Sequence, residues 1–192
     1  MVIHGAVERS SSILELGSGP GRLTRVLVAL GHSVTAVDDS EEMLRHVTGA
    51  ETVCADLYHL EIDRRFDVVL AASHLINRPG EENQLSLLRV CRRHVDAGGI
   101  VLVERYPPGW ILTAQSGENQ VGPIQVTFEA GPLENGIRSA SMTYRLANQS
   151  WRQDFEAADA DDAVLDAVAG RAGLHLEGSL DADATWVKLV AI

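Results

Sequence analysis

The chain has 192 residues, of which 45% are hydrophobic, a length and composition ordinary for one globular domain with a sizeable core. Its formal net charge is −11, with 16 Lys and Arg residues against 27 Asp and Glu residues, so its surface repels phosphate backbones and we expect no nucleic-acid partner. No apolar run approaches the ~20 residues of a membrane span, and the first residues lack the pattern of a signal peptide, so we expect no membrane partner.

The first half of the chain alternates short apolar runs with segments of helical periodicity. Strands are expected at residues 12–16, 33–37, 51–54, 66–71 and 99–104, and helices at residues 20–30, 40–48 and 81–95. Such alternation is typical of a parallel sheet that is covered by helices on both faces.

Between the first strand and the first helix lies a loop with glycine at positions 17, 19 and 21. Glycine lets the backbone turn sharply and lets a ligand approach it without meeting a Cβ. The helix that follows offers unpaired N–H groups to a polar ligand. Asp38 ends the second strand, where a carboxylate can bind ribose hydroxyls. The spacing predicts a nucleoside-cofactor site, although Asp38 alone could equally cap the helix that begins near Ser40.

The second half of the chain changes character after Tyr106, where two prolines and a glycine interrupt the pattern. Residues 124–129, 137–146 and 150–156 alternate with period two and predict a three-stranded antiparallel meander. A helix over residues 160–172 and a closing antiparallel pair over residues 174–180 and 185–192 follow. We expect one domain over residues 1–192, with residues 107–156 as an antiparallel insertion.

The glycine loop is a weak match to a dinucleotide-binding loop. That loop requires G-x-G-x-x-G, whereas Arg22 stands at the third glycine position and Gly21 comes one place earlier. The segment from Glu15 to Gly21 instead resembles motif I of the class I S-adenosylmethionine-dependent methyltransferases, which ends in an acidic residue, a hydrophobic residue and G-x-G-x-G. Residues 37–44, 54–57, 66–74 and 98–104 resemble the later motifs of that family in the same order.

The resemblance implies a Rossmann-like, doubly wound, seven-stranded mixed sheet with an antiparallel β-meander inserted after strand five. It also implies S-adenosylmethionine as cofactor and S-adenosylhomocysteine as product. In the family, the residue that corresponds to Asp38 binds both ribose hydroxyls. The residue that corresponds to Met43 lies near the adenine, and the one that corresponds to Asp56 accepts a hydrogen bond from the adenine amino group. The residues placed at the cofactor are Glu15, Gly17, Ser18, Gly19, Gly21, Arg22, Asp38, Asp39, Met43, Asp56, Leu57 and Ala72.

The implied reaction transfers a methyl group from a sulfonium to O or N of a small-molecule acceptor, and the protein contributes mainly alignment. His74 directly follows strand four, at the strand end where ligands bind in open α/β sheets, and histidine has a suitable pKa for a base. Packing beneath the inserted strands is the structural alternative for His74. Tyr106, with Glu104, ends strand five and could orient the acceptor. We therefore name His74 and Tyr106 as catalytic candidates. Trp110, Tyr144 and Trp151 could form an apolar acceptor wall, although core packing is the commoner role of such residues.

In several small-molecule members of the family, inserted strands cover the acceptor, and we expect the same of residues 107–156. The alternative is a sheet extension that only packs or forms a homodimer. Only about a dozen residues precede the first strand, whereas many relatives carry further helices there. The expectation is therefore a more open pocket, a pocket covered by another subunit, or a chain whose start is missing.

Two other functions compete with a methyltransferase. A nicotinamide-dependent oxidoreductase is disfavoured by Arg22 and by the lack of a Tyr-x-x-x-Lys pair, since Lys188 is the only lysine. A non-catalytic module that binds S-adenosylmethionine stays open, because fold alone does not decide function. Cys54 and Cys91 are too few for a disulfide framework, and no cysteines and histidines have metal-ligand spacing, so we expect a cytoplasmic protein without a metal site.

Overall fold

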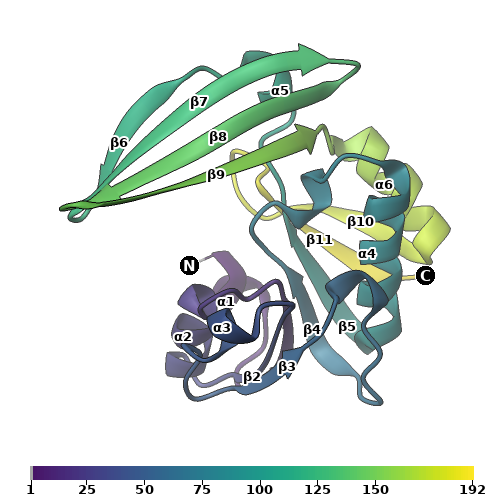
Figure 1. Cartoon of the computed structure of the whole chain (residues 1–192). Helices are drawn as coiled ribbons and strands as arrows, with labels where there is room; N and C mark the ends of the chain where they lie inside the picture. The colour runs from purple at the N-terminus through teal and green to yellow at the C-terminus, as the bar shows by residue number, and fades with distance from the viewer. Residues whose placement is uncertain (1) are drawn as a thin grey trace.

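The computed structural model describes residues 2–192, whose strands form two separate sheets (Figure 1). The central sheet has seven strands in the order β10-β11-β5-β4-β1-β2-β3, of which β1 to β5 are parallel and β10 and β11 form an antiparallel edge. This is the predicted seven-stranded mixed α/β sheet. Its strands are β1 (Ser12–Leu16), β2 (Ser33–Asp38), β3 (Glu51–Cys54), β4 (Phe66–Ala71), β5 (Val95–Glu104), β10 (Leu174–Ser179) and β11 (Trp186–Ala191).

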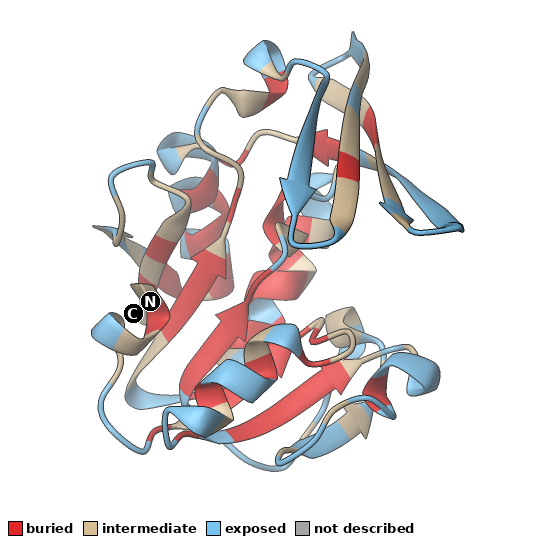
Figure 2. Cartoon of the chain, turned by 90° about the vertical axis from the view of Figure 1, so that its left-hand side faces the viewer, coloured by how far each residue is buried: buried red, intermediate tan, exposed pale blue. Residues whose placement is uncertain are grey.

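Helices cover both faces of the central sheet, and the parallel strands are accordingly apolar on both sides. Leu14 and Val69 pack toward α4 and α6, whereas Ile13 and Leu70 pack toward α1 and α2. Figure 2 shows these strands as the continuous buried centre of the molecule. The helices are α1 (Val2–Ala6), α2 (Arg22–Ala29), α3 (Glu41–Leu44), α4 (Glu81–His94), α5 (Trp110–Thr113) and α6 (Asp162–Ala172), with the 3₁₀ turns η1 (Leu57–His59) and η2 (Leu75–Asn77).

The second sheet is antiparallel and has four strands, not the three that were expected. It comprises β6 (Gly117–Val121), β7 (Ile124–Glu134), β8 (Ile137–Leu146) and β9 (Gln149–Ala158), in sequence order. The missed strand β6 is an exposed edge whose sequence shows no apolar alternation. Gly131 lies inside β7 at a register shift, where a Cβ would meet the Ser139 carbonyl oxygen at 2.9 Å. The hairpin turn is formed by Asn135 and Gly136, with φ of 51° and 78°.

Other boundaries differ at the helices and at β5. Helix α3 covers only part of the predicted 40–48, and α2 covers only part of the predicted 20–30. Strand β5 begins at Val95, four residues early, and its pairing with β4 shifts between Phe66 and Val68. The short helix α1 was not expected, and its Ile3 is buried against the central sheet. Among residues 2–192 no helix is long and apolar enough to cross a membrane.

Two buried polar side chains hold the second sheet over the carboxyl edge of the central sheet. Asn77 donates from Nδ2 to the Ala158 carbonyl at 2.9 Å and accepts the Tyr106 N–H at Oδ1, also at 2.9 Å. Both ends of the segment that carries the second sheet are thus joined to one residue. Arg105 is fully buried and ties the end of β5 to α6 and to the loop before β11. Its guanidinium donates to the carbonyls of Ala184 and Ala160 and pairs with Asp162 at 2.6 Å.

Replacing Arg105 with methionine should lower the free energy of unfolding by about 3 kcal/mol or more, because two carbonyls and a carboxylate lose their partner. Urea denaturation followed by circular dichroism measures the change. Arg45→Met is the matched control, since its ion pair with Glu41 is exposed and should contribute no more than about 0.5 kcal/mol. Equal losses in the two variants would contradict the role assigned to Arg105.

Candidate functional site

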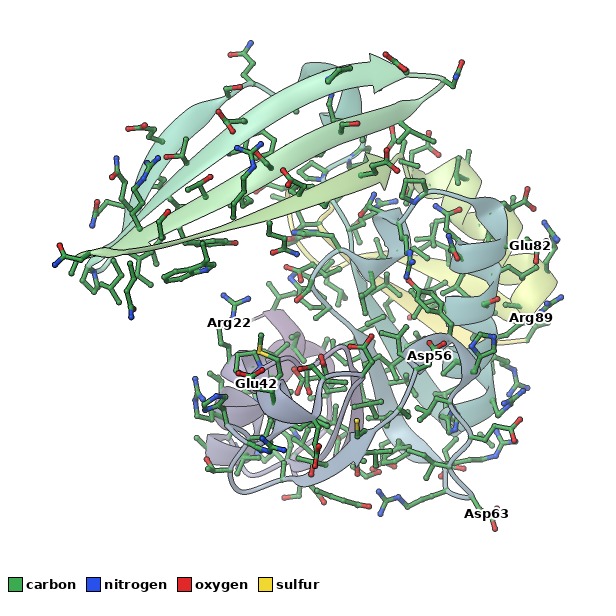
Figure 3. All side chains as sticks on the ribbon, viewed as in Figure 1. Arg22, Glu42, Asp56, Asp63, Glu82 and Arg89 are labelled. Carbon is green, nitrogen blue, oxygen red and sulfur yellow. The ribbon has the colours of Figure 1, made fainter. Side chains whose placement is uncertain are left out.

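A cleft of about 1540 Å³ lies between the carboxyl edge of the central sheet and the second sheet. Its walls come from the loops that follow β1, β2, β3, β4 and β5, and from the facing side of β7, β8 and β9. Figure 1 shows how the second sheet lies across this edge. In Figure 3, Arg22 at the start of α2 points toward the second sheet. The carboxyl ends of parallel strands are the usual ligand site of open α/β sheets.

The glycine loop lies at one end of the cleft. Gly17, Gly19 and Gly21 all have positive φ, of 68°, 53° and 77°. A Cβ on Gly17 would meet Leu75 at 3.1 Å, whereas a Cβ on Gly19 would meet nothing within 4 Å, so the loop has one open side. Helix α2 begins directly after Gly21 without a side-chain cap. Its first N–H groups are therefore available to an anionic or polar ligand group.

Asp38 is joined to this loop through its carboxylate. Oδ2 accepts the Gly19 N–H at 2.8 Å and Oδ1 accepts the Ser40 N–H at 3.0 Å. Ser40 in turn caps α3 by accepting the N–H of Met43. A carboxylate offers about four lone-pair sites, so two of them stay free for ligand hydroxyls. Asp38 and its exposed neighbour Asp39 both line the cleft.

Glu15 lies beneath the loop and does not line the cleft. It is 2% exposed and accepts a 2.5 Å hydrogen bond from the Thr24 hydroxyl, which joins β1 to α2. Burial raises the pKa of Glu15 to about 7, against the lowering effect of the Thr24 hydrogen bond. The carboxyl group is therefore partly protonated near neutral pH.

The turn η1 forms the side wall of the cleft. Asp56 is exposed and caps η1, accepting the Tyr58 N–H at 2.9 Å and pairing with His59 at 2.8 Å. The hydrogen bond from His59 is the main reason that the pKa of Asp56 is lowered. Leu57 and Tyr58 line the cleft, and the Tyr58 hydroxyl is buried without a hydrogen-bond partner. Sequence reasoning missed Tyr58, whose position in η1 has no motif.

The loop after β4 is strained and carries His74. Ser73 and His74 have φ of 58° and 57°, a left-handed conformation that costs non-glycine residues about 1–3 kcal/mol each and clusters at functional sites. Glu104, at the end of neighbouring β5, accepts the Ser73 N–H at 2.6 Å. The His74 Nδ1 atom is buried without a partner, and the ring lines the cleft. Burial lowers the pKa of His74, against the opposing effect of Glu104.

A row of aromatic rings connects this loop to the second sheet. His74 stacks on Tyr106 with ring centroids 4.0 Å apart, Tyr106 stacks on Trp110 at 3.9 Å, and Trp110 contacts Phe128 of β7 at 5.6 Å. Burial, with a smaller contribution from Glu104, raises the pKa of Tyr106 to about 12, so its hydroxyl stays protonated. The row fixes the position of both catalytic candidates.

The structure brings together eight of the predicted site residues along the cleft. These are Gly17, Arg22, Asp38, Asp39, Asp56, Leu57, His74 and Tyr106. The other six, Glu15, Ser18, Gly19, Gly21, Met43 and Ala72, do not line it. Met43 is 45% exposed on α3, Ala72 is buried, and the Ser18 hydroxyl is buried without a partner. Of the expected acceptor wall, Trp110 and Tyr144 line the cleft, whereas Trp151 stacks on Tyr144 and is 45% exposed.

No three His, Cys, Asp or Glu side chains within residues 2–192 are grouped so that they could hold a metal ion. Cys91 is buried in α4, and burial raises the pKa of its thiol to about 12. Cys54 is exposed at the end of β3, and both cysteines are free thiols.

Residues 13–99 match a family model described as a methyltransferase domain. An S-adenosylmethionine-dependent methyltransferase from Clostridium acetobutylicum superposes with a TM-score of 0.80 at 17% identity, over 100% of this chain and 89% of that one. The CcbJ methyltransferase from Streptomyces caelestis superposes with a TM-score of 0.79 at 22% identity, over 100% of this chain and 93% of that one. CalS10 from Micromonospora echinaspora superposes with a TM-score of 0.76 at 14% identity, over 99% of this chain and 87% of that one. It is an amino pentose methyltransferase whose structure was solved with bound S-adenosylmethionine. A search of curated sequences finds no matching protein.

The buried carboxyl of Glu15 should make stability depend on pH. Because its pKa is raised on folding, its favourable contribution is fully present below its ordinary pKa of 4.5 and is lost as the pH rises through about 7. Glu15→Gln should remove this loss. Between pH 4.5 and pH 8, the free energy of unfolding of the variant should therefore rise relative to that of the wild type by on the order of 2 kcal/mol. Urea denaturation of both proteins across this range measures the difference. A difference that does not change with pH would show that Glu15 ionises normally.

Proposed function

We propose that this chain, which carries a methyltransferase domain with the class I S-adenosylmethionine-dependent fold, transfers the methyl group of S-adenosylmethionine to N or O of a small-molecule acceptor. The observation that carries the proposal is the one continuous cleft that leads from the glycine loop and Asp38, past His74, to the second sheet. CalS10, which shares the fold, is itself described as acting on an amino pentose.

The residues at the glycine-loop end of the cleft fit a nucleoside cofactor. The loop has an open side at Gly19, the Ser18 hydroxyl is buried without a partner, and Asp38 keeps lone pairs free. We assign the amino-acid end of the cofactor to the loop and α2, the ribose to Asp38, and the adenine to the wall at Asp56 and Leu57. When bound, S-adenosylmethionine supplies an activated methyl group with a neutral leaving group.

The protein aligns the acceptor, removes its proton and excludes water. His74 is the group placed to take the proton, because the residue lines the cleft, its Nδ1 atom has no hydrogen-bond partner, and burial keeps the ring neutral at physiological pH. Tyr106 keeps its proton and can donate a hydrogen bond to the acceptor. The second sheet, held by Asn77 and by the aromatic row, covers the acceptor and limits access of water.

The competing functions lack an observation of this kind. The methyltransferase-domain match over residues 13–99 and the position of Arg22 both go against a nicotinamide-dependent oxidoreductase. A strained loop that brings His74 to the cleft favours a catalytic protein over a non-catalytic binding module.

Asp38→Ala should weaken S-adenosylhomocysteine binding by at least about tenfold, since hydrogen bonds to a charged acceptor are lost. Isothermal titration calorimetry measures the affinity, and a urea melt checks that the variant is folded. Asp63→Ala is the matched control, because Asp63 is exposed at the end of the molecule farthest from the second sheet (Figure 3). If Asp38→Ala binds as tightly as the control, the ribose is not at Asp38.

His74→Asn should leave S-adenosylhomocysteine affinity unchanged and lower kcat by about 100-fold or more, because the general base is lost. Asparagine tolerates the left-handed backbone of this position, so the loop should keep its shape. As the pH is raised, kcat of the wild type should increase through a pKa below 6.5, where His74 loses its proton. The variant should lack this increase of kcat with pH. Unchanged kcat with an accepted substrate would make His74 structural.

A further inference from the structure

We infer that the acceptor is an amine, which binds as its ammonium form against the carboxylate of Glu104. The inference rests on the proposed function and adds the chemical class of the acceptor and the residue that selects it. Neither the family match nor the fold assigns a role to Glu104, which is the last residue of β5 and lines the cleft.

Glu104 is a half-buried carboxylate without a cationic partner. One of its oxygens accepts the Ser73 N–H at 2.6 Å. No Arg, Lys or His within residues 2–192 forms an ion pair with it, although many other carboxylates of the chain have such a partner. Its aromatic neighbours His74 and Tyr106 are uncharged at neutral pH. A carboxylate without a cationic partner in the protein can form a charge-assisted hydrogen bond with a cationic group of a ligand.

The charges around the acceptor end of the cleft also disfavour an anion. Glu104 of β5 and Asp154 and Glu156 of β9 line this part. The two arginines of the cleft, Arg22 and Arg78, come from the start of α2 and from the loop after η2. Arg78 lies over the ring of Tyr58, 5.2 Å from its centroid, at the cofactor end. Asp154 is paired with Arg152, but Glu104 has no such neutralisation. A carboxylate or phosphate in the acceptor would therefore meet net repulsion here.

The proton chemistry separates an amine from a hydroxyl acceptor. A base whose pKa lies below 6.5 can accept a proton from an alkylammonium, whose pKa is near that of lysine at about 10.4, far more readily than from an aliphatic alcohol. A phenol is acidic enough, but its anion would lie against Glu104. An amine alone satisfies both the acidity of the donor and the charge of the site.

One proton and one electron pair move in the transfer. The ammonium gives one proton to the imidazole of His74, and the freed lone pair of the amine nitrogen forms the bond to the methyl carbon. The bond between that carbon and sulfur breaks, and its electron pair stays on sulfur. The products are S-adenosylhomocysteine and an N-methylated ammonium, which Glu104 still faces, and His74 then returns its proton to solvent.

Binding of three probes that share one ring tests the inference: benzylamine, benzyl alcohol and benzoate. Calorimetric or NMR titrations are run on the full chain, with and without S-adenosylhomocysteine. Benzylamine should bind at least about tenfold more tightly than the alcohol, with benzoate weakest. Glu104→Gln keeps an acceptor for the Ser73 N–H, and it should abolish the preference for the amine without changing S-adenosylhomocysteine affinity. Glu82→Gln, on the rim of the same cleft, is the matched control and should retain the preference.

The outcomes separate this inference from the proposed function. If S-adenosylhomocysteine binds but the alcohol or benzoate binds as well as the amine, or if no probe binds, the amine assignment is wrong and the methyltransferase assignment stands. If S-adenosylhomocysteine does not bind while the Glu104-dependent preference for the amine persists, the proposed cofactor is wrong and the amine site stands. A preference for the amine that survives Glu104→Gln would also overturn the role of Glu104.

Discussion

Asn77 makes the two hydrogen bonds on which the geometry of the cleft depends. Its amide joins Tyr106, where the chain leaves the central sheet, to Ala158, where the chain returns from the second sheet. Because the side chain is buried, a missing partner at either end would leave a polar group unpaired inside the protein. The second sheet is therefore fixed at its base, while its edge strand β6 and the far ends of its hairpins remain exposed.

The same part of the molecule holds the candidate catalytic residues in place. Parallel strands β4 and β5 are neighbours, so the residues that follow them meet at one edge of the sheet. This adjacency brings Glu104 to the Ser73 N–H and holds two consecutive residues in a left-handed conformation. His74 is then fixed by stacking on Tyr106, and its Nδ1 atom is left without a hydrogen-bond partner. Strain at this turn is offset by the contacts that surround it.

The sequence predicts those parts of the fold whose signals are local. Strands β1, β3 and β4 have the bounds predicted from the sequence, and the glycine loop predicts the turn between β1 and α2. Strand β6 escapes prediction, because it is held by backbone pairing to β7 while its side chains face solvent. The contact between Asn77 and Ala158 joins residues far apart in the chain and has no local pattern.

In the candidate site too, some residues are predicted by local sequence position, whereas others are brought to the cleft only by the tertiary structure. Asp38 and His74 are found from their place after a strand, since strand ends carry the ligands in this type of sheet. Tyr58, Phe128 and Phe155 join the cleft only because η1 and the second sheet converge on it. The motif predicts Glu15 at the cofactor. In the structure its carboxyl group instead lies beneath the loop, hydrogen-bonded to Thr24, and does not line the cleft.

We propose that one cleft holds the cofactor at the glycine loop and the acceptor beneath the second sheet. A crystal structure of the protein with S-adenosylhomocysteine would show where the nucleoside binds. We expect the ribose hydroxyls on Asp38, the amino-acid end on residues 17–19, and the sulfur facing the part of the cleft that contains His74 and Glu104. Nucleoside bound elsewhere, or a sulfur directed away from His74, would contradict it.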